Sequence, residues 1–447
     1  MKSKIFKHFL VFLMIVSLVV VIIAKAFFVS SPNLFLAIYG VSVTVVVLLL
    51  FVISRWYKDP SVEIREKGLN KKMKLPFISC ILAVRNEEKI IPRCLDSFVK
   101  SNYPYKEVIV INDASTDNTK KVLSRYNKIC NCVRIINLTK NVGKKRAIAE
   151  GLKIAKGEIF VFTDSDCVVE PDSISKIIEI FIAHEDVGAV SGHGRALNST
   201  ENLITKIQDS WYETQFSVKK AFESVYGAVT CVSGPLAVFR KSAIYNYIPA
   251  WENDSFLGQE FKFATDRQLT GYVLGSRHIG EELKRKYKDS EFLKENYPTK
   301  EWKIVYCKSA KVFTVVPNTF KKFIRQNIRW KKSFIRNLFF TGRFYWRKPI
   351  IPALKFYFGA LFIILGPFIA LRHLIYLPLT GNIFSAVYYL AGIVFIGSLY
   401  GVFYQIEDPE SKLWIYRPLM SLLSTLIFSW LIFYAMFTIK KMAWHRG

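Results

Sequence analysis

The sequence predicts an α/β fold in which a doubly wound, mostly parallel sheet lies between membrane-spanning segments. From residue 76 to about residue 316, short apolar runs typical of buried strands alternate with amphipathic helical patterns. Such alternation indicates βαβ units, which place their strands parallel in one sheet. The expected strands are residues 77–84, 107–112, 133–137 and 159–162, and the expected helices are residues 89–100, 118–126 and 144–155.

The composition indicates a membrane component. Hydrophobic residues make up 51% of the 447 residues, which is more than an ordinary soluble domain contains. The 63 Lys and Arg residues outnumber the 35 Asp and Glu residues, so the net charge is +28. A basic excess of this size suits nucleic acid, an anionic membrane surface or acidic substrates. The apolar blocks favour the last two, and we expect no nucleic-acid partner.

Five apolar blocks are long enough to cross a bilayer as helices. They are residues 9–29, 34–53, 352–375, 383–404 and 418–439. A cleaved signal peptide is the alternative for the first block, although a second block follows almost at once. Lysines and arginines before residue 9 and after residue 54 place both flanks in the cytoplasm by the positive-inside rule.

The same rule favours a cytoplasmic C-terminus, because the last residues include several cations. An even number of crossings is therefore expected. Residues 418–439 are nevertheless long and apolar enough to span.

The seven cysteines are scattered, without paired metal spacing or a small disulfide-rich context. We expect all of them to be reduced thiols that face the cytosol.

The stretch IFVFTDSD, residues 159–166, ends a buried strand with two carboxylates one residue apart. Ligands of open α/β sheets gather at the carboxyl ends of strands. Asp164 and Asp166 are placed there to share a divalent cation and the phosphates that it neutralises, as a nucleotide-sugar donor requires. The alternative is a solvated loop after a strand.

Two further polar clusters follow expected strands. Asp113 is placed to accept hydrogen bonds from a uracil or ribose, although Ser115 to Asn118 can equally be a helix cap. Gly143 and Lys144, in the run NVGKKR, open a helix whose amide groups and dipole attract phosphate. The glycine spacing matches neither a P-loop nor a dinucleotide fingerprint.

Four ordered motifs resemble the donor half of family-2 inverting glycosyltransferases with the GT-A fold. They are ISCILAVRNEE, VIVINDASTDNT, NVGKKRAIAEGL and FTDSD. The later segments VSGPLAVFR, FLGQEFKFATDRQLT and RQNIRW are similar to the acceptor, catalytic-base and QxxRW segments of processive membrane synthases. The pair of SGPL and FLG–DRxLT most closely resembles hyaluronan synthases.

This resemblance implies a role for each matching residue. Asp266 would be the general base, and Asp164 and Asp166 would hold Mg²⁺ or Mn²⁺. The implied donor contacts are Ala83, Asp113, Lys144, Asp164, Arg329 and, from a final element that closes over the site, Trp444 and Arg446. The implied acceptor contacts are Arg195, Ser233, Gly234, Pro235, Gln326 and Trp330.

The resemblance also implies a domain order. Residues 1–55 would form a transmembrane hairpin, residues 56–316 a cytosolic GT-A domain, residues 317–349 interfacial amphipathic helices, and residues 350–447 a transmembrane region that ends in an interfacial helix. The expected location is the plasma membrane, with several crossings and the catalytic domain in the cytoplasm.

The implied activity is polymerisation of UDP-sugars into a β-linked polysaccharide that crosses the membrane. The donors would be UDP-GlcNAc, alone or together with UDP-GlcA. Thr265 stands where hyaluronan synthases carry a second aspartate, and Lys145 stands where they carry arginine, so the product is left open. A transferase that adds one sugar to a lipid carrier, or an inactive glycan-binding or transport protein, are the alternatives.

Overall fold

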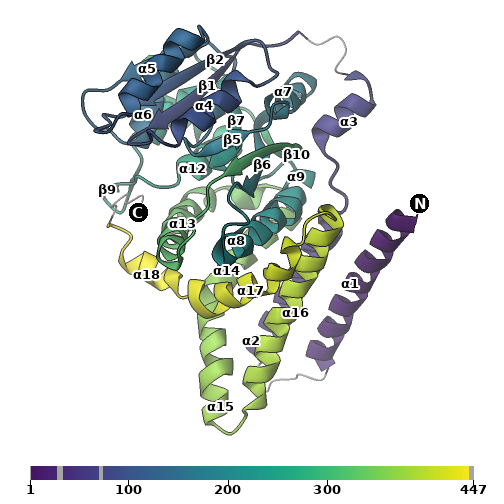
Figure 1. Ribbon diagram of the computed structural model, residues 1–447. Coiled ribbons are helices and arrows are strands. Elements are labelled where there is room, and N and C mark those ends of the chain that lie inside the picture. The colour runs from purple at the N-terminus through teal and green to yellow at the C-terminus, as the bar shows by residue number, and fades with distance from the viewer. Residues whose placement is uncertain (1, 28–33, 70–73, 442–447) are drawn as a thin grey trace.

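The computed structural model describes all residues except 1, 28–33, 70–73 and 442–447 (Figure 1). Its centre is an eight-stranded sheet with the order β3-β2-β1-β4-β7-β6-β10-β5. The strands are β1 (Ile78–Val84), β2 (Lys106–Asn112), β3 (Val133–Asn137), β4 (Ile159–Phe162), β5 (Cys167–Val169), β6 (Val187–Ala196), β7 (Ala237–Arg240) and β10 (Lys303–Thr314). Strand β7 is antiparallel to β4 and β6, and β5 is antiparallel to β10, whereas the other pairs are parallel. The predicted α/β class with a mostly parallel sheet is confirmed.

Helices cover both faces of this sheet (Figure 1). The main ones are α4 (Ile91–Val99), α5 (Thr119–Ile129), α6 (Lys144–Ile154), α7 (Ser173–Ala183) and α12 (Thr265–Lys286). Alternate residues of one strand enter different cores, since successive side chains point to opposite faces. Ile81 packs in the core that contains α6, whereas Cys80 and Leu82 pack in the core that contains α4 and α7. Burial on both faces explains why these strands read as continuous apolar runs.

Several further elements complete the domain. A two-stranded hairpin, β8 (Ser255–Phe256) and β9 (Gln259–Glu260), turns through Leu257 and Gly258, which both have positive φ. The other helices are α3 (Pro60–Glu66), α8 (Leu203–Thr214), the π-helix η2 (Gln215–Lys220), α9 (Ala221–Val225), η3 (Gly234–Leu236), α10 (Lys241–Ile244), η4 (Tyr245–Tyr247), α11 (Ile248–Glu252), η5 (Glu291–Leu293), α13 (Phe320–Thr341) and η6 (Tyr345–Arg347).

Apolar helices extend from one side of the sheet domain (Figure 1). They are α1 (Lys2–Phe27), α2 (Leu34–Ser54), α14 (Ile350–Leu371), η7 (Arg372–Tyr376), α15 (Leu377–Leu379), α16 (Phe384–Glu407), η8 (Leu413–Tyr416), α17 (Arg417–Leu423), η9 (Ser424–Phe428) and α18 (Leu431–Phe437). Three helical stretches of the described chain are long and apolar enough to cross a membrane: Leu36–Ser54, Ile350–Leu379 and Phe384–Glu407. This finding indicates membrane association.

The first and last apolar blocks differ from these three. The apolar part of α1 is the shorter stretch Phe9–Lys25, and the Lys25 ammonium within it donates to Gly40 O (3.2 Å) and Thr44 Oγ1 (2.9 Å) of α2. The last block is broken, since Leu413–Phe428 and Leu431–Phe437 meet at a 41° bend. The two pieces make a fourth span only if they are counted together. The predicted interfacial role of this block remains a prediction.

Polar contacts join the apolar helices to the sheet. Glu407, at the end of α16, accepts from Arg55 beyond α2 (2.7 Å) and also contacts the Lys308 ammonium of β10. The Tyr57 hydroxyl donates to Tyr306 O (2.8 Å), again in β10. Strand β10 is therefore fastened to the end of α16 and to the chain that follows α2.

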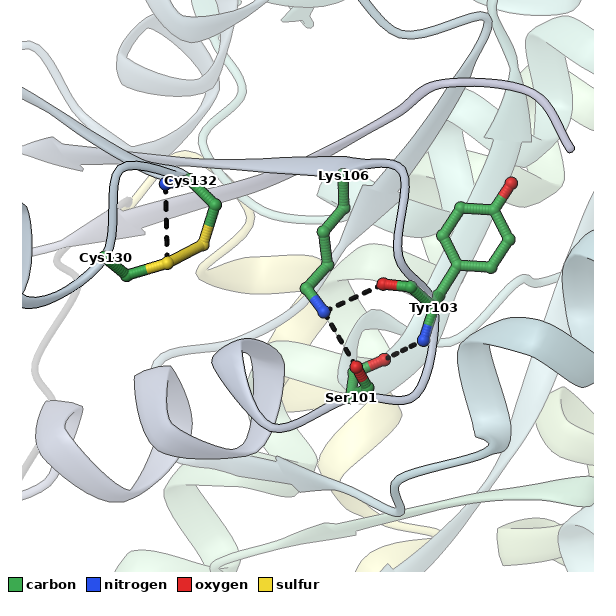
Figure 2. Close-up of a disulfide and its surroundings, with 5 residues drawn as sticks. All are labelled: Ser101, Tyr103, Lys106, Cys130 and Cys132. Atoms are coloured by element: carbon green, nitrogen blue, oxygen red, sulfur yellow. Dashed lines mark hydrogen bonds between the residues drawn. A yellow bond between two sulfur atoms is a disulfide. The ribbon is translucent and has the colours of Figure 1, made fainter.

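The prediction that all seven cysteines are free is wrong for two of them. Cys130 and Cys132, at the turn between α5 and β3, form a disulfide (Figure 2). Their Cα atoms are 5.2 Å apart, within the range that a disulfide spans. The cysteine spacings typical of metal sites and of disulfide-rich secreted proteins do not include two cysteines separated by a single residue. The other five cysteines are free: Cys80, Cys94, Cys167, Cys231 and Cys307.

A second turn lies near this disulfide. The Lys106 ammonium donates to Ser101 O (2.8 Å) and Tyr103 O (2.9 Å) and so fixes the loop that enters β2 (Figure 2).

Candidate active site

Strand β4 delivers the two carboxylates that the sequence singles out. Asp164, Asp166 and Cys167 follow it, and their possible ligand atoms all lie within 4.8 Å of one another. Asp166 Oδ1 also accepts from Thr314 Oγ1 of β10 (3.3 Å) and from Cys167 Sγ (3.5 Å). Carboxylate oxygens this close together are a donor set that suits a hard divalent cation.

The electrostatics of this carboxylate group are consistent with a cation site. Burial, followed by the neighbouring Asp164, raises the pKa of Asp166 to about 6. The Lys144 ammonium, at the first position of α6, contacts Asp164 Oδ1. Burial, the largest single influence, lowers the pKa of Lys144, but the charge and hydrogen bond of Asp164 together with the charges of Asp266 and Asp166 raise it, so the net shift is upward. The site therefore holds carboxylates, which could bind a metal ion, next to an ammonium group, which could bind a diphosphate.

Asp266 reaches the same region from α12. It lies in the first turn of that helix, where its Oδ2 accepts the Gly234 N–H (2.9 Å). The preceding Ala264 has φ +64°, and the Trp251 indole N–H donates to Thr265 O (2.9 Å). The hydrogen bonds from Gly234 and Trp251 therefore fix the position of the first turn of α12.

Gly234 brings the two carboxylate groups together. A Cβ on this residue would lie 3.1 Å from Asp164 Oδ2 and 3.7 Å from Asp266 Oδ2. Strand β7 explains this approach, because it runs antiparallel to β4 and so begins at the edge where β4 ends. A small cavity of about 30 Å³ adjoins this point, and Lys144, Gly234 and Asp266 are among its lining residues.

Asp113 is fixed by the loop that precedes α6. Its Oδ1 accepts the Val142 N–H (2.8 Å), and its Oδ2 accepts the Gly143 N–H (3.0 Å). Gly143 has φ +85°, a backbone conformation that favours glycine. Ala83 lies beside this position, since β1 pairs it with Ile111 of β2. The predicted donor contacts thus lie at neighbouring strand ends.

Helix α13 supplies the remaining predicted side chains. Burial lowers the pKa of Arg329, while the charges of Asp164 and Asp166 oppose that shift. Trp330 stacks on Trp211 of α8, with ring centroids 5.3 Å apart and an interplanar angle of 22°. The buried Gln326 Oε1 has no hydrogen-bond partner among the described residues.

Arg195 is committed to a buried ion cluster. Its guanidinium makes two hydrogen bonds with Asp209 (2.8 and 3.1 Å), and it also donates to Glu213 (3.1 Å), Asp408 (2.9 Å) and Tyr404 (2.8 Å). These contacts use all five N–H donors of the side chain. The cluster joins β6 to α8 and to the end of α16. An acceptor role for Arg195 remains a prediction that would require one of these bonds to be exchanged.

Residues 79–248 match the family model described as glycosyl transferase family 2. The protein is a glycosyltransferase.

Curated relatives of the glycosyltransferase confirm the resemblance seen in its motifs. It is 25% identical over 374 residues to the hyaluronan synthase of Streptococcus pyogenes, and this alignment covers 82% of each chain. Hyaluronan synthase 3 of Xenopus laevis is 23% identical over 406 residues, which cover 83% of this chain and 68% of that one. An N-acetylglucosaminyltransferase of Rhizobium meliloti is 31% identical over 269 residues, which cover 59% of this chain and 57% of the relative.

The structure adds residues that sequence reasoning missed. Cys167 and Thr314 complete the surroundings of Asp166, and Trp211 completes the stack on Trp330. A thiol directly after the second aspartate is a signal that was available in the sequence. The contacts of Thr314 and Trp211 were not, because these residues are far from their partners along the chain.

Two predicted donor residues, Trp444 and Arg446, lie outside the described residues. His193 of β6 lies near a carboxylate, since its Nε2 is 3.0 Å from Glu213 Oε2. Within the described ranges, the carboxylate group at the end of β4 is the one cluster of three or more metal-binding side chains, and it does not include this histidine.

Proposed function

We propose that the glycosyltransferase transfers sugars from a UDP-sugar to a growing β-linked polysaccharide with inversion at the anomeric carbon. The observation that carries this proposal is the approach of Asp164 and Asp266 to the same face of Gly234. Asp164, which would hold the metal ion of the donor diphosphate, and Asp266, which would accept the proton of the acceptor hydroxyl, then lie next to the same small cavity. An inverting transfer needs this arrangement and no covalent enzyme intermediate.

Asp113, with Ala83 beside it, would bind the uridine, and Lys144 and Arg329 would bind the diphosphate. Asp164 and Asp166 would hold Mg²⁺ or Mn²⁺, which when bound neutralises the departing UDP. Asp266 Oδ2 would take the proton of the acceptor hydroxyl as that oxygen attacks the anomeric carbon. The Gly234 N–H, which already donates to Asp266 Oδ2, would hold the carboxylate in position for this proton transfer.

The acceptor side would consist of the segment Ser233, Gly234 and Pro235 together with Gln326 and Trp330. Trp330 offers the apolar face of an indole to a sugar ring, and its stack on Trp211 fixes the orientation of that indole. The unpartnered Gln326 Oε1 is an acceptor suited to a sugar hydroxyl. Arg195 would act behind this segment through its ion cluster.

The hyaluronan synthase relatives support a processive synthase whose donors are UDP-GlcNAc, alone or together with UDP-GlcA. The apolar helices would place the enzyme in the plasma membrane with its catalytic domain in the cytoplasm, and the product would pass between those helices. The second candidate is transfer of a single sugar to a lipid carrier. The half-buried Trp330, which follows Arg329 on α13 and stacks on Trp211, favours a glycan acceptor instead.

The deciding experiment uses purified enzyme in liposomes with Mn²⁺ and radiolabelled UDP-sugars, supplied singly and in pairs. We expect a high-molecular-weight product that EDTA abolishes. A short product that organic solvent extracts would support the lipid carrier, and no transfer from any UDP-sugar would refute the proposal.

Asp266→Asn tests the base. We expect this variant to lose transfer while it still binds UDP, whereas the exposed Asp289→Asn, beyond the C-terminal end of α12, keeps both. Retained turnover in Asp266→Asn would remove Asp266 from its proposed role.

A further inference from the structure

A buried charged triad includes Lys145, the residue that follows Lys144 in the run NVGKKR and that has no role in the site described above. It consists of Lys145, Asp254 and Arg336, whose side chains are 7%, 2% and 11% exposed. The Lys145 ammonium donates to Asp254 Oδ2 (3.0 Å), Phe261 O (2.8 Å) and Gln268 Oε1 (2.8 Å). An ammonium group has three donors, and all three are used here.

Asp254 links this lysine to a second cation. Its Oδ1 accepts from Arg336 Nη2 at 2.6 Å, while its backbone carbonyl accepts the Phe261 N–H at 2.8 Å. The Arg336 guanidinium lies over the rings of Phe256 (5.6 Å) and Phe340 (5.1 Å). One buried carboxylate thus holds two buried cations from different helices.

The triad and its hydrogen-bond partners lie on the same chain segments as residues of the proposed active site. Lys145 follows Lys144, which contacts Asp164. Gln268 lies on α12 two positions after Asp266, and the Phe261 carbonyl belongs to the loop that enters this helix. Arg336 follows Arg329 on α13 by about two helical turns, so both side chains lie on the same side of that helix.

A buried ionic group of this kind contributes little to stability compared with apolar residues of the same volume. Its geometry, in contrast, is specific, because each hydrogen bond fixes a direction as well as a distance. Through Gln268 and the Phe261 carbonyl, the triad joins α6, the start of α12 and α13, which carry the proposed phosphate-binding lysine, the base and the diphosphate-binding arginine.

We propose that Lys145 is a positioning residue that holds the diphosphate-binding Lys144 and the base Asp266 in register through Asp254, Phe261 and Gln268. This inference rests on the proposed function, because it assigns Lys145 to the transfer step of that same site. Lys144 and Lys145 are neighbours on a helix and point in different directions. One reaches the donor, and the other anchors the helix end to the base segment.

Lys145→Met tests the inference because it removes the charge and all three hydrogen bonds while it keeps most of the side-chain volume. We expect kcat to fall at least tenfold, with the UDP-sugar KM and the UDP Kd changed less than twofold. Lys145→Arg should recover part of the loss, since arginine can still donate to Asp254. Lys153→Met is the matched control, because Lys153 forms partly exposed ion pairs from the same helix.

Amide hydrogen exchange of residues 253–268 gives a readout that does not depend on turnover. We expect faster exchange there in Lys145→Met and in Asp254→Asn, and no change in Lys153→Met. If Lys145→Met does not fold, Asp254→Asn is measured in its place, with the same expected results.

Three results would overturn the inference. They are a kcat within twofold of the parent enzyme, a fall in UDP affinity as large as the fall in kcat, or unchanged exchange in residues 253–268. A parent enzyme that transfers no sugar would instead refute the proposed function, and the exchange measurement would still decide whether Lys145 fixes this segment.

Discussion

The carboxylates of Asp164 and Asp266 approach the same side of the Gly234 backbone, although they belong to different elements and lie far apart in the sequence. A methyl group on residue 234 would meet the first oxygen at 3.1 Å and the second at 3.7 Å. The distance to Asp164 is shorter than ordinary van der Waals contact.

Gly234→Ala should therefore displace the Asp164 carboxylate without straining the backbone. We expect kcat to fall at least tenfold while the melting temperature changes little, as turnover and thermal unfolding of the detergent-solubilised enzyme would show. Gly392→Ala on α16 is the control, because its added Cβ would have no neighbour within 4 Å. Full turnover in Gly234→Ala would show that the two carboxylates tolerate separation.

The stack of Trp211 and Trp330 should contribute to stability beyond the area that each ring buries. A double-mutant cycle with Trp211→Ala and Trp330→Ala should give a coupling free energy of about 0.5–1.5 kcal/mol. Denaturant unfolding measures this value. Trp330→Ala should also shorten the product on a sizing gel, whereas Trp330→Phe should restore most of its length. Independent effects of the two substitutions would mean that the rings do not support each other.

Asp209 should matter more to folding than Asp408, although both contact Arg195. Asp209 is 1% exposed and forms two hydrogen bonds with the guanidinium, whereas Asp408 is 29% exposed. Loss of a buried partner leaves an uncompensated charge and costs about 3–5 kcal/mol. We expect a loss of this size for Asp209→Ala and less than about 1 kcal/mol for Asp408→Ala, measured by denaturant titration. Equal losses would contradict the assignment of Arg195 to a buried cluster.

Lys219, on the π-helix η2, should make stability depend on pH. Burial, followed by the charges of Lys355 and Arg417, lowers its pKa to about 7 from the ordinary 10.5. The unfolded chain therefore binds more protons between these two values, and stability should rise as the pH increases from 7 towards 10.5. Below pH 7 the cost of keeping this half-buried ammonium charged is fully present.

Lys219→Met should accordingly raise the melting temperature more at pH 6 than at pH 9. Thermal unfolding at both values measures the difference, and the exposed Lys120→Met should show none. An equal rise in melting temperature at pH 6 and pH 9 would mean that the charge on Lys219 does not destabilise the folded protein.

The first half of the sheet was predictable from the sequence because its signals are local. Strands β1 to β4 and helices α4 to α6 lie within a few residues of the expected ranges, since an apolar run and an amphipathic period are each visible in one short window. The later strands lack such a run. Strand β6 reads VGAVSGHGRA, and its glycines admit the side chains of Trp302, Leu236 and Phe216, which come from elsewhere in the chain.

The site shows the same division. Asp164, Asp166 and Asp113 were predictable because a carboxylate at the end of a strand is a local pattern. The contacts of Lys145 with Asp254 and Gln268 were not, since they depend on how α6, α12 and the loop after α11 pack together. The disulfide between Cys130 and Cys132 was missed for a different reason: the rules applied to cysteine spacing describe other classes of protein.

The edge position of β5 has a consequence for the nascent chain. This short strand begins at Cys167, directly after Asp166, and its strand partner is β10, which ends at Thr314. The Asp166 carboxylate therefore cannot reach its final surroundings until residue 314 has left the ribosome, long after α1 and α2 have emerged. Through that interval β6 lacks its parallel partner β10, so we expect the incomplete chain to depend on chaperones while its first helices are already available to the insertion machinery.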